Sequence, residues 1–222
     1  MSPYSHHFTD GTAFPFPLGK IVCVGRNYAE HARELNNPVP TTPILFIKPA
    51  TAAVPMEQSI ELPAGAGNVH YETELSILIG ARLSHARAED VMPAIAGYGL
   101  ALDLTLRDLQ SQLKEKGHPW EIAKSFDGAC PLSPFLRAEA LPMADDWQFS
   151  LRVDGELRQE GHTQEMLTPI IPLIVYMSQH FTLQPGDVIL TGTPKGVGKL
   201  EQGQQLELEL EDRLHIATRV AS

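Results

Sequence analysis

Cysteine is scarce in this chain of 222 residues, and long apolar runs are absent. The two cysteines, Cys23 and Cys130, cannot form a disulfide framework, which predicts a reducing, cytoplasmic environment. The chain does not open with positive charge followed by an apolar segment, so we expect no signal peptide. Because no stretch reaches the roughly 20 apolar residues that a membrane helix needs, we also expect no membrane partner.

Positively charged residues are also few. Lysine and arginine total 17 against 27 aspartates and glutamates, so the formal net charge is -10. A surface this acidic argues against general binding to nucleic acid or to anionic membranes. It leaves open a small anionic ligand in a locally basic pocket. Hydrophobic residues make up 43% of the chain, which is enough to bury a core without disulfides.

A complete phosphate-binding loop is missing. The segment TGTPKGVGK (191–199) looks similar to one, but a Walker A motif needs Gly, four residues and then Gly-Lys-Ser/Thr. Thr193 stands where the first Gly should be, and Leu200 follows Lys199. The next residues are strand-like, so no helix offers its N-terminus to phosphate. A nucleotide-binding protein is therefore disfavoured, and we expect a loop that lines a small-molecule pocket, with Thr193 as a candidate ligand contact.

The regular alternation of strand and helix that is typical of a Rossmann sheet is lacking as well. Apolar and alternating segments predict strands over 20–25, 43–49, 59–63, 67–80, 97–106, 186–194 and 204–212, with a hairpin over 147–161 that turns at Asp154-Gly155. Helix formers predict helices over 27–35, 87–96, 107–117 and 166–181. The pattern predicts an α+β fold, mostly β with a few short helices: a single domain over 20–222, preceded by a short N-terminal segment over 1–19.

Three acidic residues stand inside predicted apolar strands. In GNVHYETELSILIG, Glu72 and Glu74 are two residues apart and would project from one face of the strand. Asp103 is the lone acid of ALDLTL. Buried like charges are unfavourable, and a hard divalent cation such as Mg²⁺ or Mn²⁺ would offset them. The alternative is an exposed face on which the acids pair with Lys or Arg. His70 is expected to be a structural histidine or a support behind the metal ligands.

Other charged residues offer a base and two cations. His31 and Glu34 are three residues apart on a predicted helix, so the carboxylate could orient the imidazole as a general base; a solvated surface pair is the alternative. Arg107 and Lys124 could clamp a carboxylate or steady an enolate, or they could form surface ion pairs. Neither cysteine has a base beside it: Cys23 is expected in the core, and Cys130 in a turn before Pro131.

Seven segments occur in the order seen in one known family. They are VCVGRNYAEHARE, PILFIKP, HYETELSILIG, GYGLALDLTLRDLQ, PWEIAKSFDGACP, VDGELRQEG and GDVILTGTPKGVG. From Lys20 to its C-terminus the chain resembles the fumarylacetoacetate hydrolase superfamily, and most of all its short acylpyruvase branch. The resemblance implies a mixed β-sandwich roll, a single catalytic domain over 20–222, assembly as a homodimer, and Mg²⁺ or Mn²⁺ as cofactor.

The same resemblance implies a role for each candidate residue. The metal ligands would be Glu72, Glu74 and Asp103. His31 and Glu34 would activate water on a lid over bound substrate, and Lys124 would bind the substrate and assist the enolate. The remaining contacts to the carboxylate or keto end of the substrate would come from Arg107, Gln110 and Thr193.

The function that this resemblance implies is metal-dependent hydrolysis of a C–C bond. The substrates would be acylpyruvates (2,4-diketo acids such as acetylpyruvate or fumarylpyruvate), and the products would be pyruvate and a carboxylic acid. The alternatives are oxaloacetate decarboxylation or tautomerisation, and isomerisation or decarboxylation of unsaturated dicarboxylates, because each passes through a similar enolate. The His31–Glu34 pair favours hydrolysis. It also argues against a non-enzymatic keto-acid binder, which would need no base.

Overall fold

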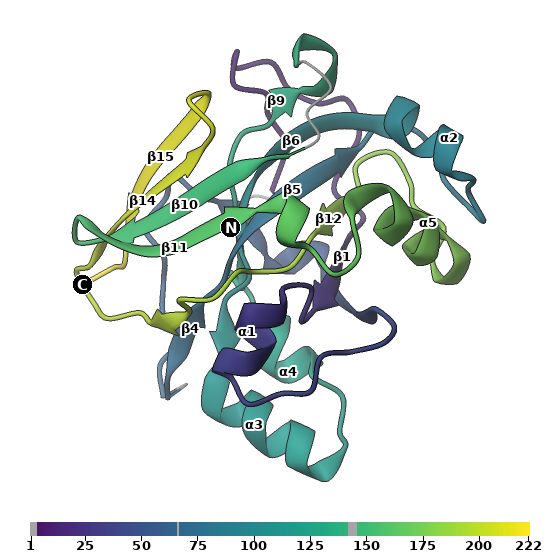
Figure 1. The fold of residues 1–222 in the computed structure, drawn as a ribbon. Helices are drawn as coiled ribbons and strands as arrows, with labels where there is room; N and C mark the ends of the chain where they lie inside the picture. Colours follow the sequence, from purple (N-terminus) through teal and green to yellow (C-terminus); the bar gives the residue numbers. More distant parts are fainter. Residues whose placement is uncertain (1–3, 66, 142–145) are drawn as a thin grey trace.

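Strands hold more residues than helices do, and in the described part of the chain they form three sheets (Figure 1). The computed structural model describes residues 4–65, 67–141 and 146–222. The largest sheet has eight strands in the order β2-β1-β12-β5-β6-β8-β3, with β9 also paired to β6. These strands are β1 (Lys20–Gly25), β2 (Ile44–Pro49), β3 (Ala53–Pro55), β5 (Thr73–Ile79), β6 (Ile95–Leu102), β8 (Cys130–Leu132), β9 (Leu136–Arg137) and β12 (Val188–Leu190).

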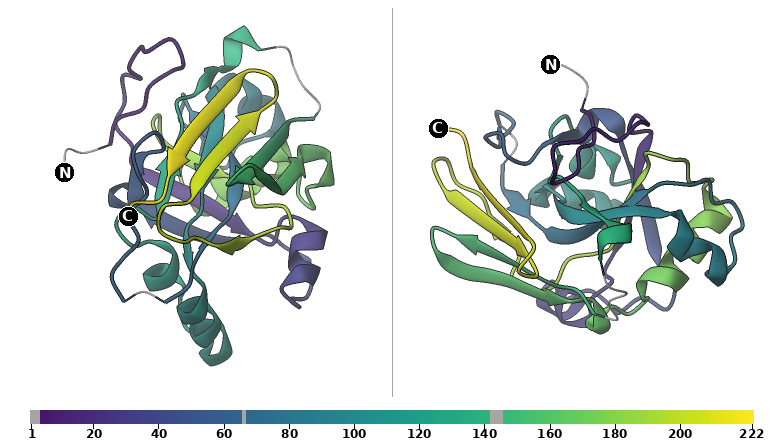
Figure 2. Two further views of the ribbon diagram at one scale, coloured as in Figure 1. Left: turned by 90° about the vertical axis from the view of Figure 1, so that its left-hand side faces the viewer. Right: turned by 90° about the horizontal axis from the view of Figure 1, so that it is seen from above.

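A second sheet of four strands lies against the large one (Figure 2). In the order β11-β10-β14-β15, its strands are β11 (Glu156–His162), β10 (Gln148–Val153), β14 (Gln205–Leu210) and β15 (Leu214–Arg219). β14 shows how the sheet is oriented: Leu206, Leu208 and Leu210 are buried, whereas Glu207 and Glu209 between them are exposed. One face of this sheet is therefore apolar and packs inward, and the other faces solvent.

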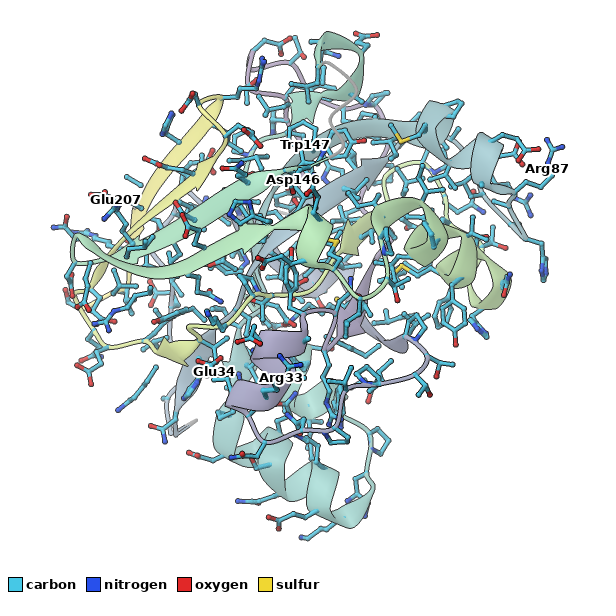
Figure 3. All side chains as sticks on the ribbon, in the orientation of Figure 1. Arg33, Glu34, Arg87, Asp146, Trp147 and Glu207 are labelled. Atoms are coloured by element: carbon cyan, nitrogen blue, oxygen red, sulfur yellow. The ribbon has the colours of Figure 1, made fainter. Side chains whose placement is uncertain are left out.

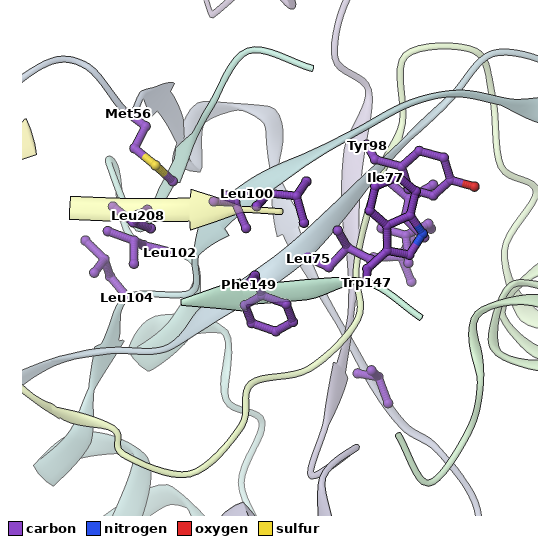
Figure 4. Close-up of a cluster of buried hydrophobic side chains, with 14 of the residues drawn as sticks. Met56, Leu75, Ile77, Tyr98, Leu100, Leu102, Leu104, Trp147, Phe149 and Leu208 are labelled. Atoms are coloured by element: carbon purple, nitrogen blue, oxygen red, sulfur yellow. The ribbon is translucent and has the colours of Figure 1, made fainter. Parts of the chain in front are cut away.

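The main hydrophobic core lies between the two sheets (Figure 4). Leu75 and Ile77 on β5 and Leu100 on β6 pack in one cluster with Phe149 on β10 and Leu208 on β14. All five side chains are at most 2% exposed. Burying one such side chain is worth about 1.5–3 kcal/mol relative to leaving it exposed. This core holds the sheets together and fixes the frame on which the polar residues are placed.

The third sheet and three helices gather at one end of the large sheet (Figure 1). The sheet contains β13 (Gly198–Lys199), β4 (Val69–Tyr71) and β7 (Thr105–Leu106). The helices are α1 (Ala29–Glu34), α3 (Arg107–Lys116) and α4 (Glu121–Lys124), whereas α2 (Ala88–Val91) and α5 (Ile170–His180) pack together elsewhere. Single 3₁₀ turns cover Ala50–Ala52, Met92–Ala94, Ala138–Ala140 and Thr163–Glu165. None of the described helices is long and apolar enough to span a membrane.

The N-terminal residues pack against the large sheet. Phe8 forms an isolated parallel bridge with Phe135, and the His6 ring bonds through Nε2 to the carbonyl oxygen of Gly186 at 2.8 Å. His6 is 1% exposed, so this contact is part of the interior. The division into a separate segment over 1–19 and a catalytic domain over 20–222 stays a prediction.

The predicted fold class, α+β and mostly β with a few short helices, is confirmed. The hairpin is confirmed too, since Asp154 and Gly155 adopt φ of 51° and 79° between β10 and β11. The strand predicted over 59–63 is wrong, because there only Ile60 forms an isolated bridge, with Val220. The helix predicted over 87–96 is shorter than expected: it becomes a 3₁₀ turn at Met92, where Pro93 has no N–H to donate, and β6 begins at Ile95.

Candidate active site and metal centre

The acidic residues lie where the chain passes from one sheet to another. Between β4 in the small sheet and β5 in the large sheet stands Glu72, and Asp103 directly follows β6 before the chain enters β7. The prediction of continuous strands over 67–80 and 97–106 is therefore wrong at these residues. A strand that changes sheets must leave its ladder of hydrogen bonds. The two crossings lie side by side, because the N–H of Asp103 donates to the carbonyl oxygen of Glu72 at 2.8 Å.

The crossings bring three carboxylates together. Ligand atoms of Glu72, Glu74 and Asp103 all lie within 4.8 Å of one another. The three residues are 5%, 1% and 1% exposed, so the alternative of an exposed acidic face is wrong. Glu74 is fixed by the loop after β12, where the N–H of Gly192 donates to its Oε2 at 2.6 Å.

Lys124 lies among these acids. Its ammonium donates to Oε2 of Glu72 at 2.8 Å, to Oδ2 of Asp103 at 2.6 Å and to the hydroxyl of Thr105 at 2.7 Å. Burial alone would lower the pKa of Lys124, but Asp103 and Glu72 raise it to about 12. Lys124 is therefore a buried ammonium group paired with two carboxylates.

Arg107 and Gln110, at the start of α3, extend the polar network. Arg107 donates to Oε1 of Glu72 and, at 2.8 Å, to Oε1 of Gln110. Burial would raise the pKa of Glu72, but Lys124 and Arg107 hold it well below its usual range. These two cations are therefore enough to keep Glu72 charged, and a charged carboxylate can serve as a metal ligand.

Lys48 contacts Asp103 without lining the pocket, and it is not among the predicted site residues. Its ammonium is 0% exposed, lies 2.8 Å from Oδ1 of Asp103, and donates to the carbonyl oxygens of Ala129 (3.1 Å) and Lys124. A signal for it exists in PILFIKP, where a lone lysine stands inside an apolar strand. That is the same pattern that singled out Asp103.

The residues present fit a divalent cation. In the described residues, Glu72 and Asp103 pair with cations, whereas Glu74 accepts only the Gly192 N–H. Burial, followed by the charges of Asp103 and Glu72, raises the pKa of Glu74 well above its usual value. A cation held by all three carboxylates would offset this repulsion, and a set of oxygen donors suits a hard ion such as Mg²⁺ or Mn²⁺.

His31 and Glu34 come from α1, as predicted. Nδ1 of His31 lies 3.5 Å from Oε2 of Glu34, and the His31 side chain is 6% exposed. Burial is the main cause that lowers the pKa of His31, so the ring is neutral near pH 7 and can accept a proton. Glu34 also accepts the N–H of Gly196 at 3.0 Å, which ties α1 to the glycine-rich loop before β13 (Figure 3).

Thr193 lies in the same loop and is held by two bonds. Its hydroxyl donates to the carbonyl oxygen of Thr73 at 2.8 Å and accepts from Nε2 of Gln159 at 2.8 Å. Gln159, on β11, is 1% exposed and also accepts the N–H of Thr73 at 2.9 Å. Nothing in the alternating sequence of that hairpin marks Gln159, because its role depends on the loop that packs against it.

These elements enclose one pocket of about 420 Å³, counting the solvent at its mouth. The predicted residues that line it are His31, Glu72, Glu74, Asp103, Arg107, Gln110, Lys124 and Thr193. Glu34 stands behind His31. His70, on β4, does not line the pocket, and burial lowers its pKa.

Both cysteines are buried in the large sheet, away from the pocket lining. Cys23 is a core residue, as expected. Cys130 opens β8 rather than lying in a turn, because residues 130–132 pair with β3. Burial raises the pKa of the Cys130 thiol to about 12, so it is not a thiolate at neutral pH.

Known proteins resemble the chain over almost its full length. The chain is 50% identical to oxaloacetate tautomerase YcgM of Escherichia coli K12 over 218 residues, which cover 98% of the chain and 99% of the relative. It is 44% identical to the human mitochondrial oxaloacetate tautomerase FAHD1, covering 90% of both chains.

A solved structure shows the same arrangement of elements. The fumarylpyruvate hydrolase from Pseudomonas aeruginosa, crystallised with Mn²⁺ and pyruvate, superposes with a TM-score of 0.93 at 37% identity, covering 100% of this chain and 97% of that one. The model of the family described as fumarylacetoacetate (FAA) hydrolase C-terminal matches residues 20–221. The chain therefore belongs to the fumarylacetoacetate hydrolase family.

Proposed function

We propose that the protein is a divalent-cation-dependent enzyme that interconverts the keto and enol forms of oxaloacetate. One observation carries the proposal: a buried, neutral His31 and the cationic Lys124 line the same pocket as the carboxylate cluster. Moving a proton on a 2-oxo acid needs a base for the carbon and positive charge for the enolate oxygen. The names of the two oxaloacetate tautomerases that resemble the chain support the same reaction.

The proposed mechanism assigns one task to each residue. Mg²⁺ or Mn²⁺, held by Glu72, Glu74 and Asp103, would supply a Lewis acid that polarises the 2-oxo group. Nδ1 of His31 lies 3.5 Å from Oε2 of Glu34 and makes no hydrogen bond in the described residues, and Nε2 of the same ring would take a proton from C3 of oxaloacetate. Lys124 stabilises the negative charge that develops on the 2-oxygen, and the proton is then delivered to that oxygen to give the enol. Each proton removed from carbon is returned to oxygen, so nothing is consumed.

Hydrolysis of an acylpyruvate is the second candidate, and the His31–Glu34 pair favours it. A carboxylate beside an imidazole is typical of a base that activates water. Here His31 would take a proton from water, the oxygen would attack C4, and the C3–C4 bond would break. Pyruvate would leave as its enolate, with Lys124 beside the developing charge. The fumarylpyruvate hydrolase that resembles the chain supports this reading.

A parallel assay separates the two candidates. The Mn²⁺-loaded protein is given oxaloacetate, acetylpyruvate and fumarylpyruvate, and the enol absorbance is followed together with the products, with and without EDTA. We expect oxaloacetate to reach its keto–enol equilibrium faster than in buffer, in a reaction that EDTA stops, without release of pyruvate. Release of pyruvate and acetate or fumarate from the diketo acids would favour hydrolysis. No acceleration of either reaction would refute both.

The family resemblance also supports a homodimer, and we propose this assembly for the protein. Sedimentation equilibrium of the purified chain, 24.4 kDa as a monomer, would test it directly. A mass that stays at the monomer value at micromolar concentrations would contradict the proposal.

A further inference from the structure

Two cations line the pocket without a carboxylate partner. Arg26 directly follows β1, and Lys114 lies on α3. Within residues 4–65, 67–141 and 146–222, Arg26 makes no hydrogen bond or ion pair, and Lys114 donates only to the amide oxygen of Asn37, at 2.8 Å. In a protein of net charge -10, two positive side chains left without an acid at one pocket are unusual. They mark a place for an anion.

The backbone holds Arg26 in an uncommon conformation. Its φ is 58°, in the left-handed region that residues other than glycine seldom adopt. The next residue, Asn27, is anchored by its side-chain amide, which donates to the carbonyl oxygens of Thr168 (3.0 Å) and Thr191 (2.9 Å). The chain therefore turns sharply at the end of β1, and Arg26 is directed to the pocket. Such strain tends to persist where it serves a binding site.

Lys114 lies close enough to Arg26 for the two charges to repel. Burial lowers the pKa of Lys114, and the charges of Arg26 and Arg107 lower it further. Both Arg26 and Lys114 are half-buried. An anion close to both would relieve this repulsion more than water does.

The inner end of the pocket does not need these two cations. There the three carboxylates stand beside three cations, Lys48, Lys124 and Arg107, which pair with Glu72 and Asp103, so the charges are equal in number. A divalent cation would add two positive charges, which would attract the first carboxylate and the 2-oxo oxygen of a substrate. Arg26 and Lys114 are left for a second negative group on the same molecule.

Part of the pocket wall is apolar, which favours a ligand that carries its charges at its two ends. Phe46 and Trp120 line the pocket and pack against each other, with ring centroids 6.0 Å apart. Val24 and Leu35 also line it. These apolar groups suit the carbon chain of a ligand and disfavour a charge between its ends.

We propose that Arg26, with Lys114 beside it, binds the distal carboxylate of a dicarboxylic 2-oxo acid. This inference rests on the proposed function, because it assumes that the 2-oxo end of the substrate lies at the carboxylate cluster. Arg26 is then a specificity-determining residue: it selects 2-oxo acids that carry a distal carboxylate over those that lack one, and it plays no part in the movement of the proton. A guanidinium is suited to this task, because it binds a carboxylate through two parallel hydrogen bonds.

Binding of a matched pair of unreactive ligands tests the inference. Malate and lactate share the 2-hydroxy acid that can chelate a metal, and malate differs by its distal carboxylate. Calorimetry with the Mn²⁺-loaded protein should show that malate binds more tightly than lactate. Arg26→Gln should weaken malate binding by about 10- to 100-fold, the range for a lost hydrogen bond to a charged group, and leave lactate binding within about 2-fold. Lys114→Met should act in the same direction with a smaller effect.

Control variants remove a charge nearby without touching the pocket lining. Arg33→Gln on α1 and Lys116→Met on α3 change exposed residues and should leave both ligands unaffected. Arg26→Asn is a second variant at the site itself, since asparagine tolerates the left-handed backbone. Thermal unfolding shows whether each variant is folded.

The outcomes separate this inference from the proposed function. Equal weakening of malate and lactate by Arg26→Gln would overturn the inference, as would unchanged malate binding or a wild-type protein that does not prefer malate. A wild-type protein that prefers malate through Arg26 but does not accelerate oxaloacetate tautomerisation would support the inference and refute the proposed function.

Discussion

Glu74 is the acid of the cluster whose charge is least compensated. Its only described partner is the N–H of Gly192, and burial raises its pKa. Glu74→Gln keeps the shape and the hydrogen bond but removes the charge that a metal would need. We expect Mn²⁺ affinity to fall by at least about 100-fold, more than the loss typical of residues behind the ligands. Stability without metal should be unchanged or rise by about 1 kcal/mol, because glutamine removes an acid whose ionisation is disfavoured in this buried place.

Calorimetry with Mn²⁺ and urea unfolding in EDTA measure the two effects of Glu74→Gln. Glu207→Gln is the matched control, since Glu207 is exposed on β14 (Figure 3). Unchanged Mn²⁺ affinity in Glu74→Gln would mean that the cluster is not the metal site.

Single residues were predictable from sequence where a charge interrupts an apolar pattern. Glu72, Glu74 and Asp103 stood out for this reason, and the structure brings them together. Lys48 carries the same signal, although its segment also fits an ordinary strand, and the structure places it on β2. Arg26 carries no such signal, because its part in the pocket depends on a backbone turn and on having no acidic partner among the described residues.

The glycine-rich loop before β13 contacts the end of α1 through Gly196 and Glu34. Gly196 adopts φ of 96°, and a Cβ there would lie 1.9 Å from the carbonyl oxygen of Arg158. Gly196→Ala must therefore move the loop away from β11 and displace the N–H that Glu34 accepts. We expect slower turnover with unchanged Mn²⁺ affinity, because His31 loses its orientation while the acids stay. Stability should fall by about 1–3 kcal/mol beyond the cost of the backbone conformation.

Gly203→Ala provides the control for that backbone cost. Gly203 also has a positive φ, 82°, but nothing lies within 4 Å of its added Cβ. Urea unfolding and steady-state kinetics of both variants separate the cost of a positive φ, which both share, from the clash of the added Cβ with Arg158, which only Gly196→Ala has. Equal stability of the two variants, or full turnover in Gly196→Ala, would show that this loop does not position α1.

Helices, strands and turns were predictable where their own sequence is enough to determine their conformation. The apolar β5 and the hairpin turn at Asp154-Gly155 were predicted correctly for this reason. Segment 59–63 has a strand-like sequence but finds only a single bridge. β13 has two residues and depends on its partner β4, so no periodicity could reveal it.

At the scale of the whole molecule, contacts between segments far apart in the sequence hold the N-terminal residues against the large sheet. The N-terminal residues reach the start of β12 through His6 and Gly186, which are 180 residues apart in the chain. The same turn is held by Asp187, which pairs with Lys20 at the start of β1. The residues before β1 are thus tied to the sheet that carries the site. Sequence alone could not show this, because no local pattern tells which residue His6 contacts 180 positions further along the chain.

The buried contact of His6 should make the stability of the protein depend on pH. Burial is the main cause that lowers the pKa of His6, so the folded protein keeps the ring neutral at pH values where the unfolded chain already binds a proton. The unfolded state therefore holds more protons, and stability is lost as pH falls below the ordinary histidine pKa of about 6.5. One such group changes the unfolding free energy by at most about 1.4 kcal/mol per pH unit. His6→Gln should remove this part of the dependence between pH 7.5 and 5, whereas His7→Gln, at an exposed neighbour, should keep it. Urea unfolding at several pH values measures the slopes, and identical slopes for the wild type and His6→Gln would show that the N-terminal contact does not sense protons.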